Sequence, residues 1–135
     1  MIQRIAITGM GIVSAIGNNV QENLLALAQQ KSGIGQLELL DTIHQNFPCG
    51  EIKLTNTHLV DALKVKQDEA FTRAALLGVK AAEEALQQAQ ISSTNKIAFV
   101  NGTSVGGMDY TEKLYQDFSK NPHTTKYIEA QHPGF

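Results

Sequence analysis

Two short apolar segments, each followed directly by a glycine-rich loop, constrain the fold of this chain more than any other feature. Residues 4–8 read RIAIT and lead into Gly9 and Gly11, and residues 97–100 read IAFV and lead into a loop with three glycines. A short apolar run bounded by turn residues is typical of a buried strand. Because helical patterns follow both loops, the sequence predicts an α/β fold with a mostly parallel sheet flanked by helices.

The first helix is predicted to begin after Asn19. Asparagine is a good N-cap, Glu22 stands three residues later and can close a capping box, and Gly33 stops the helix. We expect its inner face to carry Val20, Leu24, Leu27 and Ala28.

The clearest helical pattern covers residues 68–90. One stripe consists mostly of small residues: Phe71, Ala74, Ala75, Gly78, Ala82, Ala85, Leu86 and Ala89. Small side chains let a helix approach its neighbour closely. Glycine costs about 1 kcal/mol of helix propensity relative to alanine, so we expect a close packing contact at Gly78. The neighbouring Glu83 and Glu84 indicate a solvated face.

The remaining elements are less sharply marked. Residues 47–54 could hold an interrupted strand and residues 57–63 a short helix. A last helix is predicted from about Asp109, with Leu114 and Phe118 facing inward, and Pro122 ends it.

Composition narrows the class of protein. The 135 residues suffice for one modest domain, and 42% hydrophobic with 18% charged residues is globular composition. A net charge of −2 without a basic run argues against nucleic acid as a partner. The apolar runs are too short for a membrane span or a signal peptide, and a single cysteine permits no internal disulfide. We therefore expect a cytoplasmic protein.

The first glycine loop partly matches a dinucleotide-binding fingerprint. Gly9, Gly11 and Ser14 follow a predicted strand and precede a helix, but serine stands in the third position and the helix begins several residues too late. No further strand ends in an acidic residue at the expected spacing of about 20 residues. The alternatives at this loop are a tight strand-to-helix connection and a small nucleotide-binding domain.

No other residue pattern indicates a catalytic, phosphate-binding or metal-binding site. Residues 102–107, GTSVGG, lack the Lys-Ser/Thr pair of a P-loop, and their glycines indicate close backbone approach to a ligand or, more simply, to the protein itself. Cys49 has no histidine at a spacing that suggests a dyad. The histidines, at 44, 58, 123 and 132, lack the spacing of a zinc site. The residues predict no catalytic set, no metal and no cofactor.

Four markers in order nevertheless resemble the N-terminal part of the β-ketoacyl synthases of fatty-acid and polyketide synthesis. They are residues 4–18, RIAITGMGIVSAIGN; residues 31–34, KSGI; the alanine-rich pattern of residues 73–89; and the strand and glycine loop of residues 97–107. Their order and spacing hold over nearly the whole chain, which is far more specific than any single marker.

The resemblance implies a thiolase-like α-β-α-β-α fold, usually in a homodimer. It implies a 3-oxoacyl-[acyl-carrier-protein] synthase, which transfers an acyl chain to a cysteine and condenses it decarboxylatively with malonyl on acyl carrier protein, assisted by two histidines. In the family these residues lie beyond the position of Phe135, and Cys49 does not match the nucleophile. Residues 1–135, roughly the first third of a family member, form an incomplete domain that we expect to be inactive alone.

The resemblance carries one functional region onto this chain. Family residues between the glycines of the second loop shape the acyl-chain pocket near the dimer interface. Ser104, Val105, Gly106 and Gly107 are therefore the candidate substrate-binding residues. Val105 is expected to form the end or wall of that pocket.

The chain also departs from the family pattern. Residues 66–69, KQDE, replace the usual entry to the long helix, and the segment after Lys120 lacks a Pro-Phe-rich stretch. This leaves room for a divergent subgroup or for a non-catalytic subunit of the chain-length-factor type. The expected partners are acyl carrier protein, acyl and malonyl thioesters, and a second subunit in a homodimer or a ketosynthase/chain-length-factor heterodimer.

Overall fold

The computed structural model describes residues 4–66, 71–92, 95–104, 106–121, 123 and 125 of the chain. The chain divides into two compact units. One comprises Met1–Thr55 and Lys80–Lys96, and the other comprises Asn56–Val79 and Ile97–Phe135. We call them the first and the second unit, and one long helix contributes to both.

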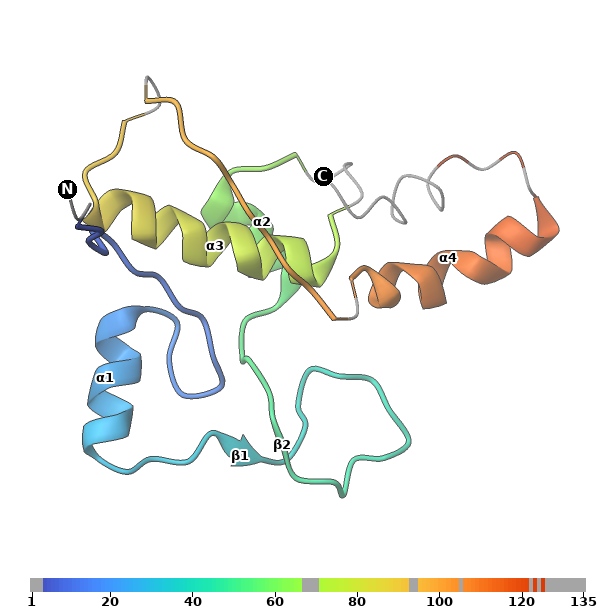
Figure 1. The fold of residues 1–135 in the computed structure, drawn as a ribbon. Coiled ribbons are helices and arrows are strands. Elements are labelled where there is room, and N and C mark those ends of the chain that lie inside the picture. Colours follow the sequence, from blue (N-terminus) through green and yellow to red (C-terminus); the bar gives the residue numbers. More distant parts are fainter. Residues whose placement is uncertain are drawn as a thin grey trace. The chain divides into compact units, whose positions relative to one another are not determined.

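Helices make up most of the regular structure (Figure 1). In chain order the elements are α1 (Val20–Ala28), β1 (Ile34–Gly35), β2 (Cys49–Gly50), α2 (Asn56–Leu63), α3 (Arg73–Gln88) and α4 (Met108–Lys120). The two strands pair antiparallel, with Ile34 opposite Gly50 and Gly35 opposite Cys49. The described residues thus combine helices with a small sheet, but this sheet is antiparallel and not the mostly parallel one predicted.

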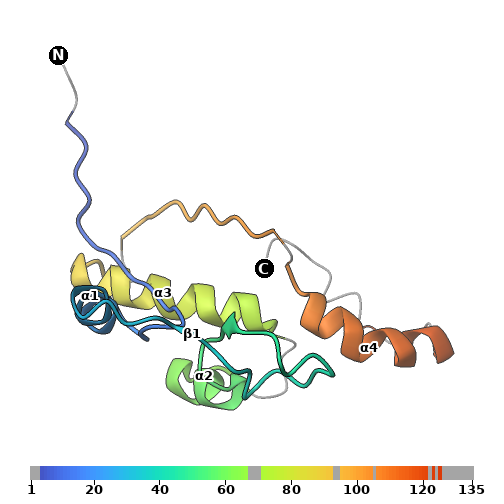
Figure 2. The ribbon, with the colours of Figure 1, turned by 90° about the horizontal axis from the view of Figure 1, so that it is seen from below.

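The two apolar segments predicted as buried strands belong to no sheet. Residues 4–8 and 97–100 have no strand partner in the described part of the chain, and Figure 2 shows residues 4–8 as an extended trace. Ile5 is 96% exposed and Val100 is 94% exposed. A strand pairs its backbone groups with neighbouring strands, and its side chains are buried where other elements cover the faces of that sheet. Because the described residues provide none beside these segments, both strand predictions are wrong for this structure.

The start of α1 follows the prediction. Asn19 has an extended backbone, with φ −158° and ψ 171°, and its side-chain oxygen accepts a hydrogen bond from the Glu22 N–H at 2.8 Å. The Glu22 carboxylate in turn accepts from the Asn18 N–H at 2.7 Å and from the Asn19 side-chain amide at 2.9 Å. The capping box is therefore present, with its return bond shifted to the residue before the cap.

The inner face of α1 differs from the prediction. Asn23 and Ala26 are buried, whereas Leu24 and Leu27 are more than half exposed. The face is set by the turn that precedes the helix, which gives hydrogen-bond partners to Asn23 and leaves the leucines outside. Apolar periodicity alone could not reveal this rotation, because a polar residue holds the central position.

Helix α3 lies inside the range predicted for the longest helix, and residues 67–70 before it are outside the described part of the chain. Leu76 is buried, but Gly78 is exposed and a Cβ built on it would have no neighbouring atom within 4 Å. The prediction of a close packing contact at Gly78 is therefore wrong for the described residues. Close approach occurs farther along the helix, at Ala81, Ala85 and Ala89.

Helices α2 and α4 agree with their predictions. α2 begins one residue before the predicted range, and its Leu59 is 1% exposed. α4 has Leu114 and Phe118 among its half-buried positions, as expected. Pro122, predicted to end α4, lies outside the described residues.

Few apolar side chains are enclosed. Ala26, Leu59 and Leu76 are the buried apolar residues of the described chain. Among its helices, none is long and apolar enough to cross a membrane. Ala26 lies in the first unit, and Leu59 and Leu76 lie in the second, so each unit encloses very little apolar surface. Contacts made by backbone and polar groups therefore carry much of the organisation of each unit.

Candidate functional site

The first glycine loop lies directly on helix α3. A Cβ at Gly9 would be 2.1 Å from the backbone oxygen of Ala85, and a Cβ at Gly11 would be 1.8 Å from the backbone oxygen of Ala81. Real Cβ atoms cannot approach so closely, so both positions require glycine. The space that these glycines leave open is filled by the protein.

Two side chains of α3 bind the backbone of this loop. Glu84 accepts hydrogen bonds from the N–H groups of Ile12 at 3.1 Å and Val20 at 2.8 Å, and Gln88 accepts from the Met10 N–H at 2.6 Å. Val20 begins α1, where free N–H groups and the helix dipole favour an anion. The Glu84 carboxylate thus holds the place that a phosphate would need. This geometry argues against the nucleotide-binding alternative.

The prediction that Glu84 lies on a solvated face is wrong. Both glutamates are half-buried, but Glu84 accepts two backbone hydrogen bonds, whereas Glu83 makes an ion pair with Lys80 at 3.6 Å. The sequence contains a sign that Glu84 binds the loop. Glu84 and Gln88 stand four residues apart and therefore share one face of the helix, near the small Ala85.

A tight turn joins the loop to α1. The Ser14 N–H donates to the Gly17 oxygen at 2.8 Å, and the Ser14 hydroxyl donates to Oδ1 of Asn23. Nδ2 of Asn23 donates to the backbone oxygens of Gly17 at 2.9 Å and Asn19 at 2.8 Å. Every polar atom of this buried amide is therefore paired, as burial demands. Gly33 packs against the same turn, since a Cβ there would be 2.8 Å from the Ala15 side chain.

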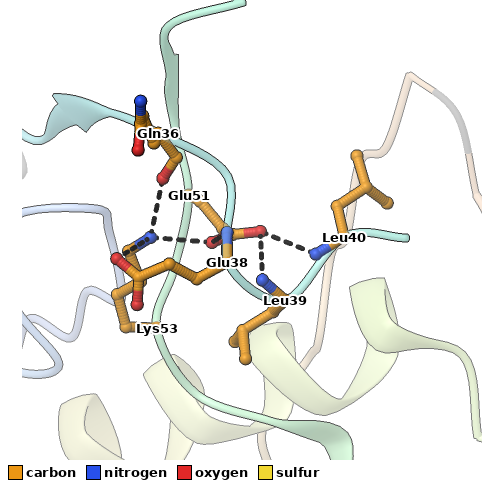
Figure 3. A network of polar contacts seen from close by, with 6 residues as sticks. All are labelled: Gln36, Glu38, Leu39, Leu40, Glu51 and Lys53. Carbon is orange, nitrogen blue, oxygen red and sulfur yellow. Dashed lines mark hydrogen bonds and ion pairs between the residues drawn. The ribbon is translucent and has the colours of Figure 1, made fainter. Parts of the chain in front are cut away.

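A second polar network, in the first unit, surrounds Glu51 (Figure 3). Its carboxylate accepts hydrogen bonds from three consecutive backbone N–H groups, those of Glu38 at 2.8 Å, Leu39 at 3.0 Å and Leu40 at 2.8 Å. Nζ of Lys53 lies 2.8 Å from the same carboxylate and also donates to the backbone oxygen of Gln36 at 3.1 Å. These bonds tie residues 36–40 to the segment after β2.

The Glu51 network predicts a pH dependence. The Lys53 side chain and the three N–H groups lower the pKa of Glu51 to about 2. A lowered pKa stabilises the folded form above the ordinary value of 4.5, and this stabilisation is lost as the pH falls toward 2. The stability difference between the wild type and Glu51→Gln, measured by urea unfolding, should therefore shrink between about pH 5 and pH 2. The exposed Glu112→Gln is the control, and a Glu51→Gln difference that stays constant with pH would contradict the assignment.

The second glycine loop differs physically from the first. Gly106 has a φ of +57°, which favours glycine, and its N–H donates to Oγ1 of Thr103 at 3.1 Å. Among the described atoms, none lies within 4 Å of a Cβ built on Gly102 or Gly106. The expectation that these glycines pack against the protein is thus not met by the described residues, and the surface beside them is open.

The candidate substrate-binding residues fall at this open loop. Ser104 is exposed, Gly106 and Gly107 are half-buried, and Val105 lies outside the described residues. Gly107 precedes α4, and its oxygen accepts the N–H groups of Tyr110 and Thr111, both at 3.0 Å. The loop therefore passes without a spacer into the first turn of α4.

The start of α4 is bonded to the start of α3 within the second unit. Oδ2 of Asp109 accepts the backbone N–H of Arg73 at 3.0 Å, and Nη1 of Arg73 donates to Oδ1 of Asn56, the first residue of α2, at 2.9 Å. The sequence pattern gave no sign of this junction, because Asp109 reads as an ordinary residue of a helix start.

The other candidates for chemistry stay apart. Cys49 is exposed in β2, and no cluster of three histidine, cysteine or acidic side chains among the described residues could hold a metal ion. A polar hollow in the first unit is lined by Asn18, Asn19, Lys80, Glu83, Glu84 and Gln87. Its carboxylates do not suit a phosphate ligand. No nucleophile and base are brought together in the part of the chain that the structure describes.

Comparison with known proteins gives a consistent family match. The family described as "Beta-ketoacyl synthase, N-terminal domain" matches residues 3–134. The chain is 36% identical over 106 residues to 3-oxoacyl-[acyl-carrier-protein] synthase 1 of Escherichia coli (strain K12), which covers 78% of this chain and 25% of that protein.

Two further relatives show the same partial coverage. Over 119 residues the chain is 31% identical to 3-oxoacyl-[acyl-carrier-protein] synthase 2 of Coxiella burnetii, covering 84% of this chain and 28% of that protein. Over 122 residues it is 34% identical to nodulation protein E of Rhizobium meliloti, covering 86% and 29%. The chain spans about a quarter of the length of these relatives, somewhat less than the third expected.

Proposed function

The chain belongs to the β-ketoacyl synthase family, whose N-terminal domain it matches almost from end to end, and on that premise we propose that it is the N-terminal part of a 3-oxoacyl-[acyl-carrier-protein] synthase. The whole enzyme would extend acyl chains in fatty-acid or polyketide-type synthesis. The relatives of this name in Escherichia coli and Coxiella burnetii support the proposal.

The proposed reaction has two stages. A cysteine thiolate attacks the acyl thioester and releases the carrier thiol. Malonyl on acyl carrier protein then loses carbon dioxide, and its carbanion attacks the acyl carbonyl, so that a carbon–carbon bond forms and the cysteine thiolate leaves. Backbone N–H groups stabilise the tetrahedral oxyanion. The nucleophile and its two histidines are not proposed among residues 1–135, which should show no condensing activity alone.

The contribution proposed for this chain is to the acyl-chain pocket. One observation carries it: a Cβ built on Gly102 or Gly106 has no described atom within 4 Å, whereas α3 fills the space beside Gly9 and Gly11. An open, glycine-lined backbone can lie close to a substrate chain. We therefore keep Ser104, Val105, Gly106 and Gly107 as the pocket loop, with Val105 at the end or wall of the pocket.

Replacing Val105 with alanine should widen that pocket. In the complete enzyme we expect Val105→Ala to favour longer acyl primers, by about tenfold in the ratio of kcat/KM for a longer and a shorter primer, since one or two methylenes in an apolar pocket are worth about 1–3 kcal/mol. Competition between two acyl-carrier-protein primers measures the ratio. Val79→Ala on the exposed side of α3 is the control, and an unchanged preference in Val105→Ala would remove the pocket assignment.

The proposed function itself is tested by the mass of the protein in its native source, together with the coding sequence past Phe135. A longer chain with a cysteine in a small-residue turn and two later histidines would support a condensing enzyme. A longer chain without that cysteine would point to a non-catalytic subunit of the chain-length-factor type. We propose acyl carrier protein as partner, a homodimer or such a heterodimer as assembly, and the cytoplasm as location.

A further inference from the structure

We propose that Asp109 is a positioning residue for the pocket loop, and that its bond to the start of α3 helps to set which acyl chain lengths the enzyme accepts. This inference rests on the proposed function of residues 102–107. It concerns a contact within the second unit, between the first turns of two helices.

The contact has the geometry of a helix cap supplied from elsewhere in the chain. Thr72 is the residue before α3; its hydroxyl accepts the N–H of Ala75 at 3.2 Å and its carbonyl accepts that of Leu76 at 3.0 Å. The N–H of Arg73, the first residue of the helix, is accepted by Asp109 at 3.0 Å. A carboxylate at a helix start gains from both the free N–H group and the helix dipole.

Asp109 is close enough in sequence to fix the end of the loop. It is the second residue of α4, and only Gly107 and Met108 separate it from Gly106. The Gly107 oxygen already accepts the N–H of Tyr110, so residues 107–110 form one hydrogen-bonded turn. Anchoring Asp109 to Arg73 therefore anchors the C-terminal end of the loop.

One hydrogen bond within the loop lies just before this anchor. Thr103 accepts the Gly106 N–H, and Gly106 has the left-handed backbone that such a turn needs. The start of α3 is itself braced, because the Arg73 side chain donates to Asn56 at the start of α2. The Thr103 side chain thus bonds the backbone at Gly106, and Asp109 bonds the helix start that follows to α3. Loss of the Asp109 bond should let the pocket wall shift.

The experiment compares four forms of the complete condensing enzyme: wild type, Asp109→Ala, Asp109→Asn and Glu112→Ala. We expect Asp109→Ala to change the ratio of kcat/KM for a longer and a shorter primer by about fivefold, the effect of losing a helix cap. Asp109→Asn keeps an oxygen acceptor and should stay within about twofold of wild type. Glu112→Ala removes an exposed acid from the same helix and should leave the ratio unchanged.

A second readout reports the contact itself. Hydrogen exchange of the Arg73 amide should be faster in Asp109→Ala by about the same factor and unchanged in Glu112→Ala. If Asp109→Ala does not fold, Asp109→Glu replaces it, because the added methylene keeps the charge but moves the loop end and should still change the ratio.

The outcomes separate this inference from the proposed function. If Val105→Ala changes the primer ratio and the Asp109 variants do not, Asp109 has no positioning role and the pocket assignment survives. If neither position changes the ratio, the pocket assignment fails and the inference fails with it. An unchanged exchange rate at Arg73 in Asp109→Ala would also overturn the inference. Faster exchange together with a changed ratio supports it.

Discussion

Replacing Gly11 with alanine should destabilise the protein by about 3–5 kcal/mol, the largest effect that the structure implies for a single methyl group. The new Cβ would be 1.8 Å from the oxygen and 2.8 Å from the carbonyl carbon of Ala81, and 3.0 Å from the nitrogen of Ala85. All three are backbone atoms of α3, so they cannot rotate away. The loop must lift from the helix, which also breaks the bond from the Ile12 N–H to Glu84.

Gly35→Ala is the matched control for this substitution. Gly35 lies in β1 of the same unit, and a Cβ there has no neighbouring atom within 4 Å among the described residues. We expect its free energy of unfolding to stay within about 0.5 kcal/mol of wild type. Urea unfolding of both variants gives the comparison. A loss below about 1 kcal/mol in Gly11→Ala would mean that the loop does not lie on α3 as described.

The sequence predicted helix starts better than helix faces. At Asn19 and Glu22 the determinants are local, because the cap and its partner stand three residues apart. The buried face of α1, by contrast, depends on a turn at residues 14–17 that offers partners to Asn23. Periodicity assigns the inner face to leucines and cannot weigh a polar residue that finds all its hydrogen bonds in another segment.

The predicted strands fail for a related reason. Residues 4–8 and 97–100 have the composition of buried strands, but a strand exists only where another strand pairs with it. The described residues leave Ile5 and Val100 almost fully exposed. The apolar composition of these segments is typical of buried strands, but the described part of the chain provides no strand that pairs with them.

The family markers turn out to describe packing more than chemistry. Gly9 and Gly11 allow the first loop to lie on α3, Gly33 allows close contact with the turn at Ala15, and Glu84 bonds the loop from the helix side. These residues are far apart in the sequence yet meet within the first unit. A resemblance built on them indicates the family and the local packing, and it assigns no catalytic residue.

Removing the Glu84 carboxylate is expected to have the second largest effect. Glu84→Ala leaves the N–H groups of Ile12 and Val20 without their acceptor, at a place where Ala85 and the loop glycines keep the surfaces in contact. Hydrogen bonds to a charged group contribute about 1.5–3 kcal/mol each, and the two bonds share one carboxylate, so we expect a loss of about 3 kcal/mol. Chemical unfolding measures the loss directly.

Two further variants decide whether that loss comes from the paired bonds. Glu84→Gln keeps one oxygen that can accept only part of the pair, so it should cost about half as much as Glu84→Ala. Glu83→Ala, one residue away, removes only a surface ion pair with Lys80 and should cost about 0.5 kcal/mol or less. Equal losses of stability in Glu83→Ala and Glu84→Ala would mean that the loss does not come from the hydrogen bonds that Glu84 accepts from Ile12 and Val20. A free energy of unfolding that rises from Ala to Gln to Glu at position 84 would instead show that one side chain of α3 binds both the glycine loop and the start of α1.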